Sequence, residues 1–317
     1  MYRIAFFIAA AFLFFTQSGH ATTWDEPWQD SVICKADFFV LAEIGHVNKH
    51  KGVKLKILKT LAGGELKGTI KVDNFYLLDL CSYSGGHGPE FYFPKGKSYF
   101  FLKKNSGNTY SIATPSAGFD YVEENKVYAT YRITQHKSIV PVDVYEQTMT
   151  ALFNHYHGKA FDLNYIHNFI TTQLSKKPAG HNQDEISEFF LQHAALECIY
   201  HLKLPGYYER ILPFLYDTSN YHIQISAARA LASCNTDDCK TVLINFIADS
   251  VQSAFTQTIC VYSLAYMKPA ALKAELTLLK EKASNVRGDF GENLMDPRIC
   301  TSMPSPKEAL ANLLRTL

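Results

Sequence analysis

The chain has 317 residues, of which 47% are hydrophobic, and it carries 31 Lys+Arg against 30 Asp+Glu. This length suggests about two domains, and the apolar fraction is sufficient for packed cores. The near-neutral charge disfavours a general nucleic-acid binder, because such proteins usually carry a basic excess, and no nucleic acid is expected among the partners.

The first 21 residues have the pattern of a secretory signal peptide. A basic residue precedes an uncharged apolar run at residues 4–15, and small residues stand at the cleavage site. This run is shorter than the roughly 20 residues that cross a membrane, and no second long apolar run follows, so no transmembrane span is expected. The sequence predicts cleavage after Ala21, export to the periplasm or the extracellular space, and an N-terminal arm at residues 22–33.

Residues 36–132, within an expected β-domain at 34–140, have the two-residue period of half-buried β-strands. Alternating apolar and polar residues, rich in β-branched and aromatic types, indicate several short strands. We expect them at residues 38–46, 53–61, 68–74, 98–104, 109–113 and 126–131, with turns at 63–64 and 105–108. Short strands at this spacing favour a closed barrel or a sandwich.

Three stretches of this half carry a family resemblance. They are residues 34–44, which begin at Cys34, residues 53–61, and residues 93–104, whose glycine turn and aromatic strand are the most specific part. Together they resemble the netrin-like module that is shared with tissue inhibitors of metalloproteinases (TIMPs). The resemblance implies a β-barrel of the oligonucleotide/oligosaccharide-binding (OB) type and a disulfide between Cys34 and Cys81, which would hold two segments together as one ridge.

The sequence departs from the inhibitors at this ridge. In that family the free α-amine of an N-terminal cysteine ligates the zinc ion of the protease. Cys34 should lie about a dozen residues inside the mature chain, so its nitrogen is an amide and cannot be that ligand. The resemblance therefore does not support protease inhibition by this mechanism.

A glycine-rich loop follows Cys81 and is a candidate contact surface. Gly85-Gly-His-Gly-Pro89 is not a phosphate-binding loop, because no Lys-Ser/Thr follows it and no helix starts there. Functional residues concentrate on long loops. We therefore predict a binding surface beside the ridge, formed by Tyr83, His87, Phe91 and Tyr92.

After Val140 the apolar period becomes helical. Residues 141–180 predict two connecting helices, at 142–153 and 163–174, which end at a Lys-Lys-Pro-Ala-Gly break. An apolar stripe over residues 186–202 predicts the next helix, which Pro205 and Gly206 terminate. The change of period and the break near residue 178 also predict that the β-domain folds without residues 182–317.

Residues 181–317 contain three segments that align with a period of 32 to 33 residues. In this register Ala195, Ala227 and Cys260 coincide, as do Ile199, Leu231 and Leu264, and the second helices carry Leu212, Leu243 and Leu276. A two-helix unit cannot bury its apolar face alone, so repetition predicts stacking. The pattern resembles HEAT-type repeats, although its period is shorter than theirs, and an irregular helical bundle is the alternative.

All seven cysteines follow the predicted signal peptide. Export permits disulfides, and the odd number leaves at least one thiol free or intermolecular. The gap between Cys234 and Cys239 falls between two helices, with Thr236 as a possible N-cap, so we favour a disulfide over a zinc site. Cys260 and Cys300 form a further candidate pair, and Cys198, at a small-residue core position, is the expected free thiol.

No residue pattern in the sequence indicates a catalytic site, a metal site or a cofactor. His155 and His157 point in different directions on a helix, and no carboxylate stands at ligand spacing from them or from His167. Gly-x-Ser-x-Gly, His-Glu-x-x-His, dinucleotide-binding and P-loop motifs are absent. The sequence therefore favours an α+β multidomain, non-catalytic protein that binds a protein partner through the barrel ridge and the helical-repeat surface. An envelope hydrolase or a protease-inhibitor-like protein is the alternative.

Overall fold

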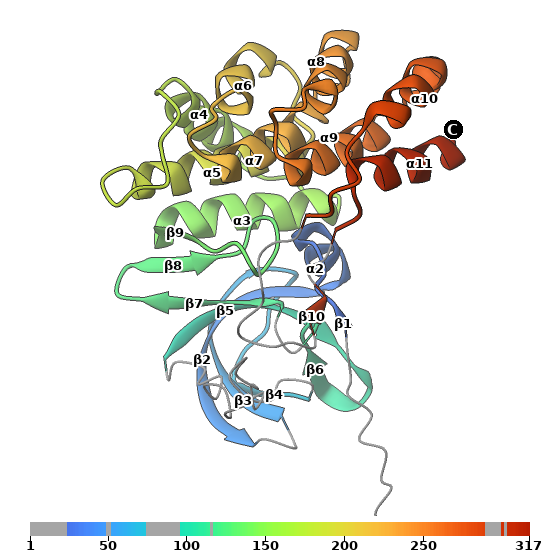
Figure 1. The fold of residues 1–317 in the computed structure, drawn as a ribbon. Helices are drawn as coiled ribbons and strands as arrows, with labels where there is room; N and C mark the ends of the chain where they lie inside the picture. The colour runs from blue at the N-terminus through green and yellow to red at the C-terminus, as the bar shows by residue number, and fades with distance from the viewer. Residues whose placement is uncertain (1–23, 49–51, 74–95, 115–116, 289–298, 301–302) are drawn as a thin grey trace, which may run out of the picture.

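A computed structural model describes residues 24–48, 52–73, 96–114, 117–288, 299–300 and 303–317 (Figure 1). A β-barrel lies on one side of helix α3 (Val142–Tyr156), and stacked helices lie on the other side. The predicted signal peptide lies outside the described residues. The α+β class expected from the sequence is confirmed, with strands in the first half and helices in the second.

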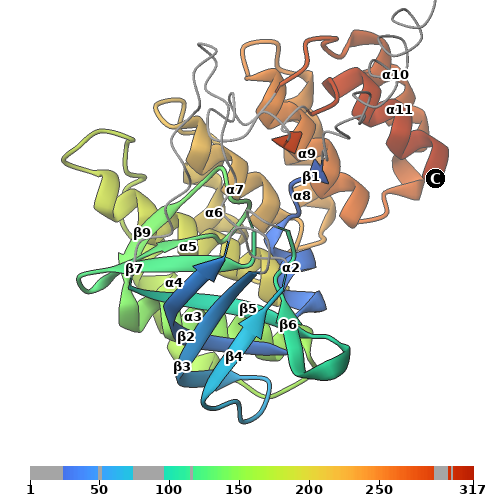
Figure 2. The same ribbon diagram turned by 90° about the horizontal axis from the view of Figure 1, so that it is seen from below.

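Five strands close the barrel. In spatial order they are β2 (Phe38–Asn48), β3 (Gly52–Ala62), β4 (Thr69–Val72), β6 (Thr109–Ser111) and β5 (Lys97–Lys104), and β5 pairs again with β2. The neighbours β4 and β6 are parallel, and the other pairs in the ring are antiparallel. Figure 2 shows this barrel from below.

A three-stranded extension continues the sheet from β5. It consists of β7 (Phe119–Glu123), β8 (Lys126–Ala129) and β9 (Ser138–Pro141). All six strands expected from the sequence are present, β8 being the last of them, whereas β7 and β9 were not predicted.

Residue alternation decides which face of each strand is buried. On β3, Val53 and Leu55 point into the barrel and Lys54 and Lys56 are exposed. The run from Ser98 to Leu102 on β5 is buried throughout, because one face lines the barrel and the other packs against helices. A strand covered on both faces reads as a continuous apolar run.

The barrel and the helices share one hydrophobic core. Phe39 of β2 stacks on Phe101 of β5 with ring centroids 4.7 Å apart, and both belong to the same buried cluster as the cores of α3 and α5 (Ile186–Leu202). Tyr131 and Arg132, which follow β8, are buried, and His201 Nε2 of α5 contacts the carbonyl oxygen of Tyr131 at 2.7 Å. This continuous core argues against the expectation that the β-domain folds without residues 182–317.

The remaining helices form two layers (Figure 1). The inner layer consists of α5, α7 (Tyr221–Leu231), α9 (Ala254–Tyr266) and α11 (Pro306–Thr316), which pack side by side in this order. The outer layer consists of α4 (Leu163–Leu174), α6 (Tyr208–Leu215), α8 (Asp237–Ala248) and α10 (Lys273–Lys282). Each outer helix packs on the inner helix that follows it in the chain.

The aligned positions of the repeat lie in the core between these helices. The inner-helix positions Ala195, Ala227, Cys260, Ile199, Leu231 and Leu264 are all buried. On the outer helices Leu243 and Leu276 are buried, whereas Leu212 is half-buried and its neighbour Ile211 fills the core. Helix α11, which the alignment did not include, packs against α9 and α10 and begins with a capping box between Ser305 and Glu308.

The N-terminal arm joins the two ends of the chain. Its strand β1 (Trp24–Asp25) pairs in parallel with β10 (Ile299–Cys300). Helix α2 (Gln29–Lys35) then buries Val32 and Ile33 against the shared core. The arm is therefore an integral part of the fold.

A buried carboxylate joins the sheet extension to α3. Asp120 is 1% exposed and accepts hydrogen bonds from Tyr145 Oη (2.7 Å), Thr130 Oγ1 (2.7 Å) and Lys137 Nζ (2.8 Å). We expect Asp120→Ala to lower the free energy of unfolding by about 3–5 kcal/mol, because a cation and two hydroxyl donors lose their acceptor. Urea denaturation would measure this loss.

The matched control for this prediction is Asp237→Ala. The Asp237 side chain is 98% exposed and pairs with Lys240 at 3.0 Å, so its loss should cost about 0–1 kcal/mol. Equal costs for the two substitutions would contradict a structural role for Asp120.

Candidate functional site

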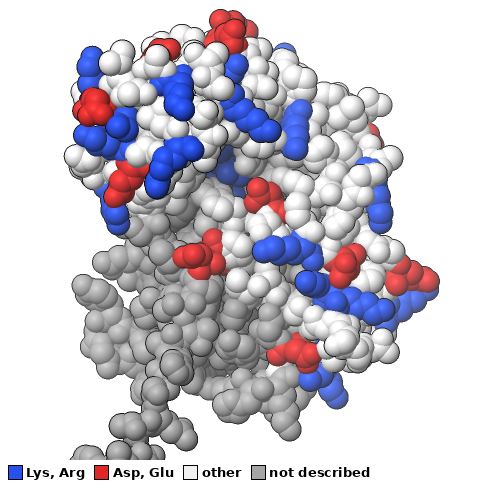
Figure 3. Space-filling model, turned by 90° about the vertical axis from the view of Figure 1, so that its right-hand side faces the viewer, with Lys and Arg blue, Asp and Glu red and all other residues white. Residues whose placement is uncertain are grey.

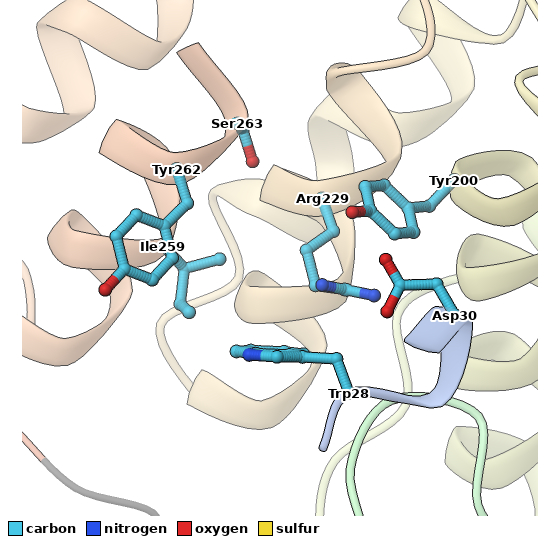
Figure 4. A pocket seen from close by; sticks show the side chains of 7 residues that line it. All are labelled: Trp28, Asp30, Tyr200, Arg229, Ile259, Tyr262 and Ser263. Atoms are coloured by element: carbon cyan, nitrogen blue, oxygen red, sulfur yellow. The ribbon is translucent and has the colours of Figure 1, made fainter. Parts of the chain in front are cut away.

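A pocket of about 150 Å³ lies where the N-terminal arm meets the inner helical layer (Figure 4). Residues from four separate segments line it. They are Trp28 and Asp30 from the arm and α2, Tyr200 of α5, Arg229 of α7, and Ile259, Tyr262 and Ser263 of α9.

Arg229 is held at the back of this pocket by two aromatic rings and a carboxylate. Its guanidinium carbon lies 4.7 Å from the ring centroid of Trp28 and 3.9 Å from that of Tyr200. Its Nε donates to both carboxylate oxygens of Glu197, at 3.2 and 3.0 Å. Burial by itself would lower the pKa of Arg229, but Glu197, Tyr200 and Asp30 together outweigh burial, so the pKa is raised. Arg229 is therefore charged and fixed in place.

Two polar groups at the pocket have unused binding capacity. Arg229 Nη2 is buried and has no hydrogen-bond partner in the described part of the chain. Asp30 is half-buried, and in Figure 4 its carboxylate faces the guanidinium, yet no ion pair joins it to any described residue. Its Oδ1 accepts only the backbone N–H of Ser31, at 2.7 Å. A donor edge and an anion thus face the same space.

Three tyrosines form an aromatic rim beside the pocket, namely Tyr200, Tyr262 and Tyr266. Tyr262 is 39% exposed and Tyr266 is 43% exposed, and the rings of Tyr200 and Tyr266 lie 6.0 Å apart. Lys203 Nζ lies 5.8 Å from the Tyr266 ring centroid. Large aromatic side chains with polar tips are suited to contact surfaces that are partly wet.

Ser226, His193 and Glu197 form a buried polar network behind Arg229. Ser226 Oγ lies 2.8 Å from His193 Nδ1 and donates to Glu197 Oε1 at 2.9 Å. All three residues are inaccessible to solvent. In a catalytic triad the carboxylate binds the imidazole and orients it. Here the Glu197 carboxylate binds the serine instead. The arrangement stabilises the contact between α5 and α7.

A cluster of histidines lies where β9, α5 and α7 meet. The His136 ring centroid lies 4.3 Å from that of His193 and 5.1 Å from that of His222. Burial lowers the pKa of His136 and His193, and it lowers the pKa of His222 to about 3. Within the described ranges, no group of three or more metal-ligating side chains is arranged to hold an ion.

The structure does not test the surface predicted from the glycine-rich loop. Tyr83, His87, Phe91 and Tyr92 lie outside the described residues, as does Cys81. The pocket itself was not predicted, because its residues are distant in the sequence and none of them belongs to a recognisable motif. Trp28 and Asp30 belong to a segment that the sequence indicated only as an arm.

No disulfide is present among the described residues. Cys34, Cys198, Cys234, Cys239 and Cys260 are free thiols, so the predicted bond between Cys234 and Cys239 is not formed here. The predicted pairings of Cys34 with Cys81 and of Cys260 with Cys300 each involve a residue whose side chain is outside the described part, and they remain predictions. Cys198 is buried, and burial raises the pKa of its thiol.

Cys234 and Cys239 face each other across the turn before α8. Thr236 is the N-cap of this helix, as predicted, and its Oγ1 accepts the N–H of Cys239 at 3.2 Å. The hydrogen bond from the Cys234 thiol lowers the pKa of Cys239 to about 6. The two thiols are thus close together, and their oxidation to a disulfide remains a prediction.

Comparison with known proteins does not assign a family, because no family model, no curated protein and no solved structure matches this chain. Across the described ranges, no helix combines the length and the hydrophobicity required to span a bilayer.

Proposed function

We propose that this chain is an exported, non-catalytic binding protein that docks a protein partner on its aromatic rim. The observation that carries the proposal is the position of Tyr262 and Tyr266, which are exposed side by side on one inner helix next to a pocket with unused polar groups. Tyrosine, tryptophan and arginine are the residues that most often dominate binding energy at protein interfaces.

The architecture supports the two resemblances on which this proposal partly depends. Numbering the five barrel strands in chain order, the ring order is 1-2-3-5-4, with the third and fifth strands parallel. This order supports an OB-type barrel of the netrin-like kind. Paired helices in two layers support HEAT-like repeats, whose stacked units create extended binding surfaces.

The hydrolase alternative has no specific support in the described residues. The contact between Ser226 and His193 is buried, so a substrate has no route to it without local opening. Measurable turnover in a hydrolase screen of the purified protein would nevertheless favour that alternative.

Photo-crosslinking in native cells would test the proposed docking surface. A crosslinking phenylalanine analogue in place of Tyr262 should capture one defined protein partner. The same analogue in place of Tyr216, which is 52% exposed and follows the outer helix α6, is the matched control and should not capture it. Chain recovered from the envelope should also begin at Thr22 if it is exported by the predicted signal peptide.

Two results would contradict the proposal. One is the absence of any adduct at position 262, and the other is equal capture at positions 262 and 216. Either result would mean that the aromatic rim is not a selective contact surface.

A further inference from the structure

We infer that the pocket beside the aromatic rim binds a free α-ammonium group together with its neighbouring carbonyl oxygen, as presented by the N-terminus of a polypeptide. This inference rests on the proposed function and names the part of the partner that enters the pocket. The residues that carry it are Asp30 and Arg229, which face the same space from two different elements (Figure 4).

The balance of charge favours a group that is a cation on one side and a hydrogen-bond acceptor on the other. Glu197 already neutralises Arg229 through Nε, so the guanidinium presents mainly an unused N–H edge. Asp30 has an unpaired carboxylate in the described structure. An α-ammonium group can donate to Asp30 while the adjacent carbonyl oxygen accepts from Arg229.

Simpler ions fit this pair less well. A phosphate or another anion would be attracted by Arg229 and repelled by Asp30 at short range. A simple cation would be attracted by Asp30 but would leave the buried Nη2 donor without an acceptor. An amine with an adjacent carbonyl satisfies both groups at once.

The size and lining of the pocket restrict the first side chain of the ligand. A volume of about 150 Å³ corresponds to about five water molecules at ~30 Å³ each. Besides the polar groups, the lining includes Ile259 and the Tyr262 ring. We therefore expect a small first residue such as alanine, with the following residues passing over the exposed Tyr262.

Three small probes would test this chemistry on the full-length chain. Alanyl-alanine amide presents the free amine, its N-acetyl form removes the charge, and free L-alanine presents the same amine beside a carboxylate. Binding would be followed by tryptophan fluorescence, because the chain has only 2 tryptophans and one of them, Trp28, lines the pocket.

We expect saturable binding of alanyl-alanine amide and a Kd at least about tenfold higher for the acetylated form, since a charge-assisted hydrogen bond is lost. Binding of free alanine without binding of alanyl-alanine amide would overturn the assignment to a polypeptide N-terminus. Equal binding of the acetylated and free-amine probes, or no binding of any probe, would overturn the inference.

Asp30→Asn is the decisive variant, because it removes the charge and retains the shape. It should raise the Kd of alanyl-alanine amide by about tenfold or more, whereas Asp237→Asn, at a residue with 98% side-chain exposure, should leave it unchanged. An unaltered urea unfolding midpoint would show that the Asp30 variant is folded. Unchanged affinity in this variant would overturn the inference.

The outcomes of this test and of the crosslinking test are independent. Capture of a partner at position 262 without binding of any amine probe would leave the proposed docking surface standing and refute the ligand chemistry. Amine binding without a captured partner would support a pocket for a small ligand and refute the docking surface.

Discussion

Replacing Glu197 with alanine should lower the free energy of unfolding by about 3–5 kcal/mol, the range observed when one partner of a buried ion pair is removed. Glu197 is inaccessible to solvent and accepts hydrogen bonds from Arg229 Nε and Ser226 Oγ. Its loss leaves a buried guanidinium without a counterion in the middle of the inner helical layer. Urea denaturation followed by circular dichroism would measure the effect.

The control for this substitution is Glu188→Ala on the same helix. Glu188 forms an ion pair with Lys176 at 2.9 Å, but both side chains are partly exposed, at 33% and 44%. We expect this variant to lose about 0–1 kcal/mol. If Glu197→Ala loses no more free energy of unfolding than Glu188→Ala, then Arg229 finds another partner or tolerates burial without a counterion.

Acidification should destabilise the protein below a pH of about 6.5, the ordinary pKa of histidine. Burial holds the pKa of His136, His193 and His222 below this value in the folded state, so the unfolded chain binds more protons than the folded chain in this range. Stability therefore falls as the pH decreases. Each histidine that stays neutral in the folded state contributes a slope of up to about 1.4 kcal/mol per pH unit.

Measuring urea unfolding at several pH values between about 7 and 5 would test this prediction, since carboxylates contribute less in this range than they do at lower pH. His136→Gln should reduce the slope by up to about 1.4 kcal/mol per pH unit. His167→Gln is the control, because His167 lies on α4 and pairs with Tyr207 outside the cluster. The prediction would be contradicted if the free energy of unfolding changed with pH equally in the unsubstituted chain, His136→Gln and His167→Gln.

Periodicity was sufficient to predict most of the elements. The expected helix at residues 163–174 matches α4, and the apolar stripe over residues 186–202 matches α5. The strands β7 and β9 were missed, and β7 contains Asp120, a charged residue that an alternating pattern assigns to the exposed face. Only the tertiary partners of Asp120 make its burial favourable.

The candidate site could not be predicted in the same way. Helix α5 is buried on nearly all sides, since α3, α4, α7 and β9 pack around it. Its polar residues His193 and Glu197 therefore lie in the core, although residues of these types are more often at least partly exposed. The contact of Glu197 with Arg229 spans 32 residues of sequence, and the contact of Arg229 with Trp28 joins the arm to α7. No local pattern encodes such pairs.

The pairing of β1 with β10 has a consequence for the order in which the chain folds. If the chain crosses a membrane from its N-terminus, Trp24 and Asp25 emerge first and their partners Ile299 and Cys300 emerge almost last. Contacts between such distant residues form slowly, because the long loop between them must close before the contacts can stabilise the fold. Trp28 reaches Arg229 from the same arm. In that case the pocket, whose lining extends from Trp28 to Ser263, is complete only after most of the chain has crossed, so a chain stalled midway would lack the pocket.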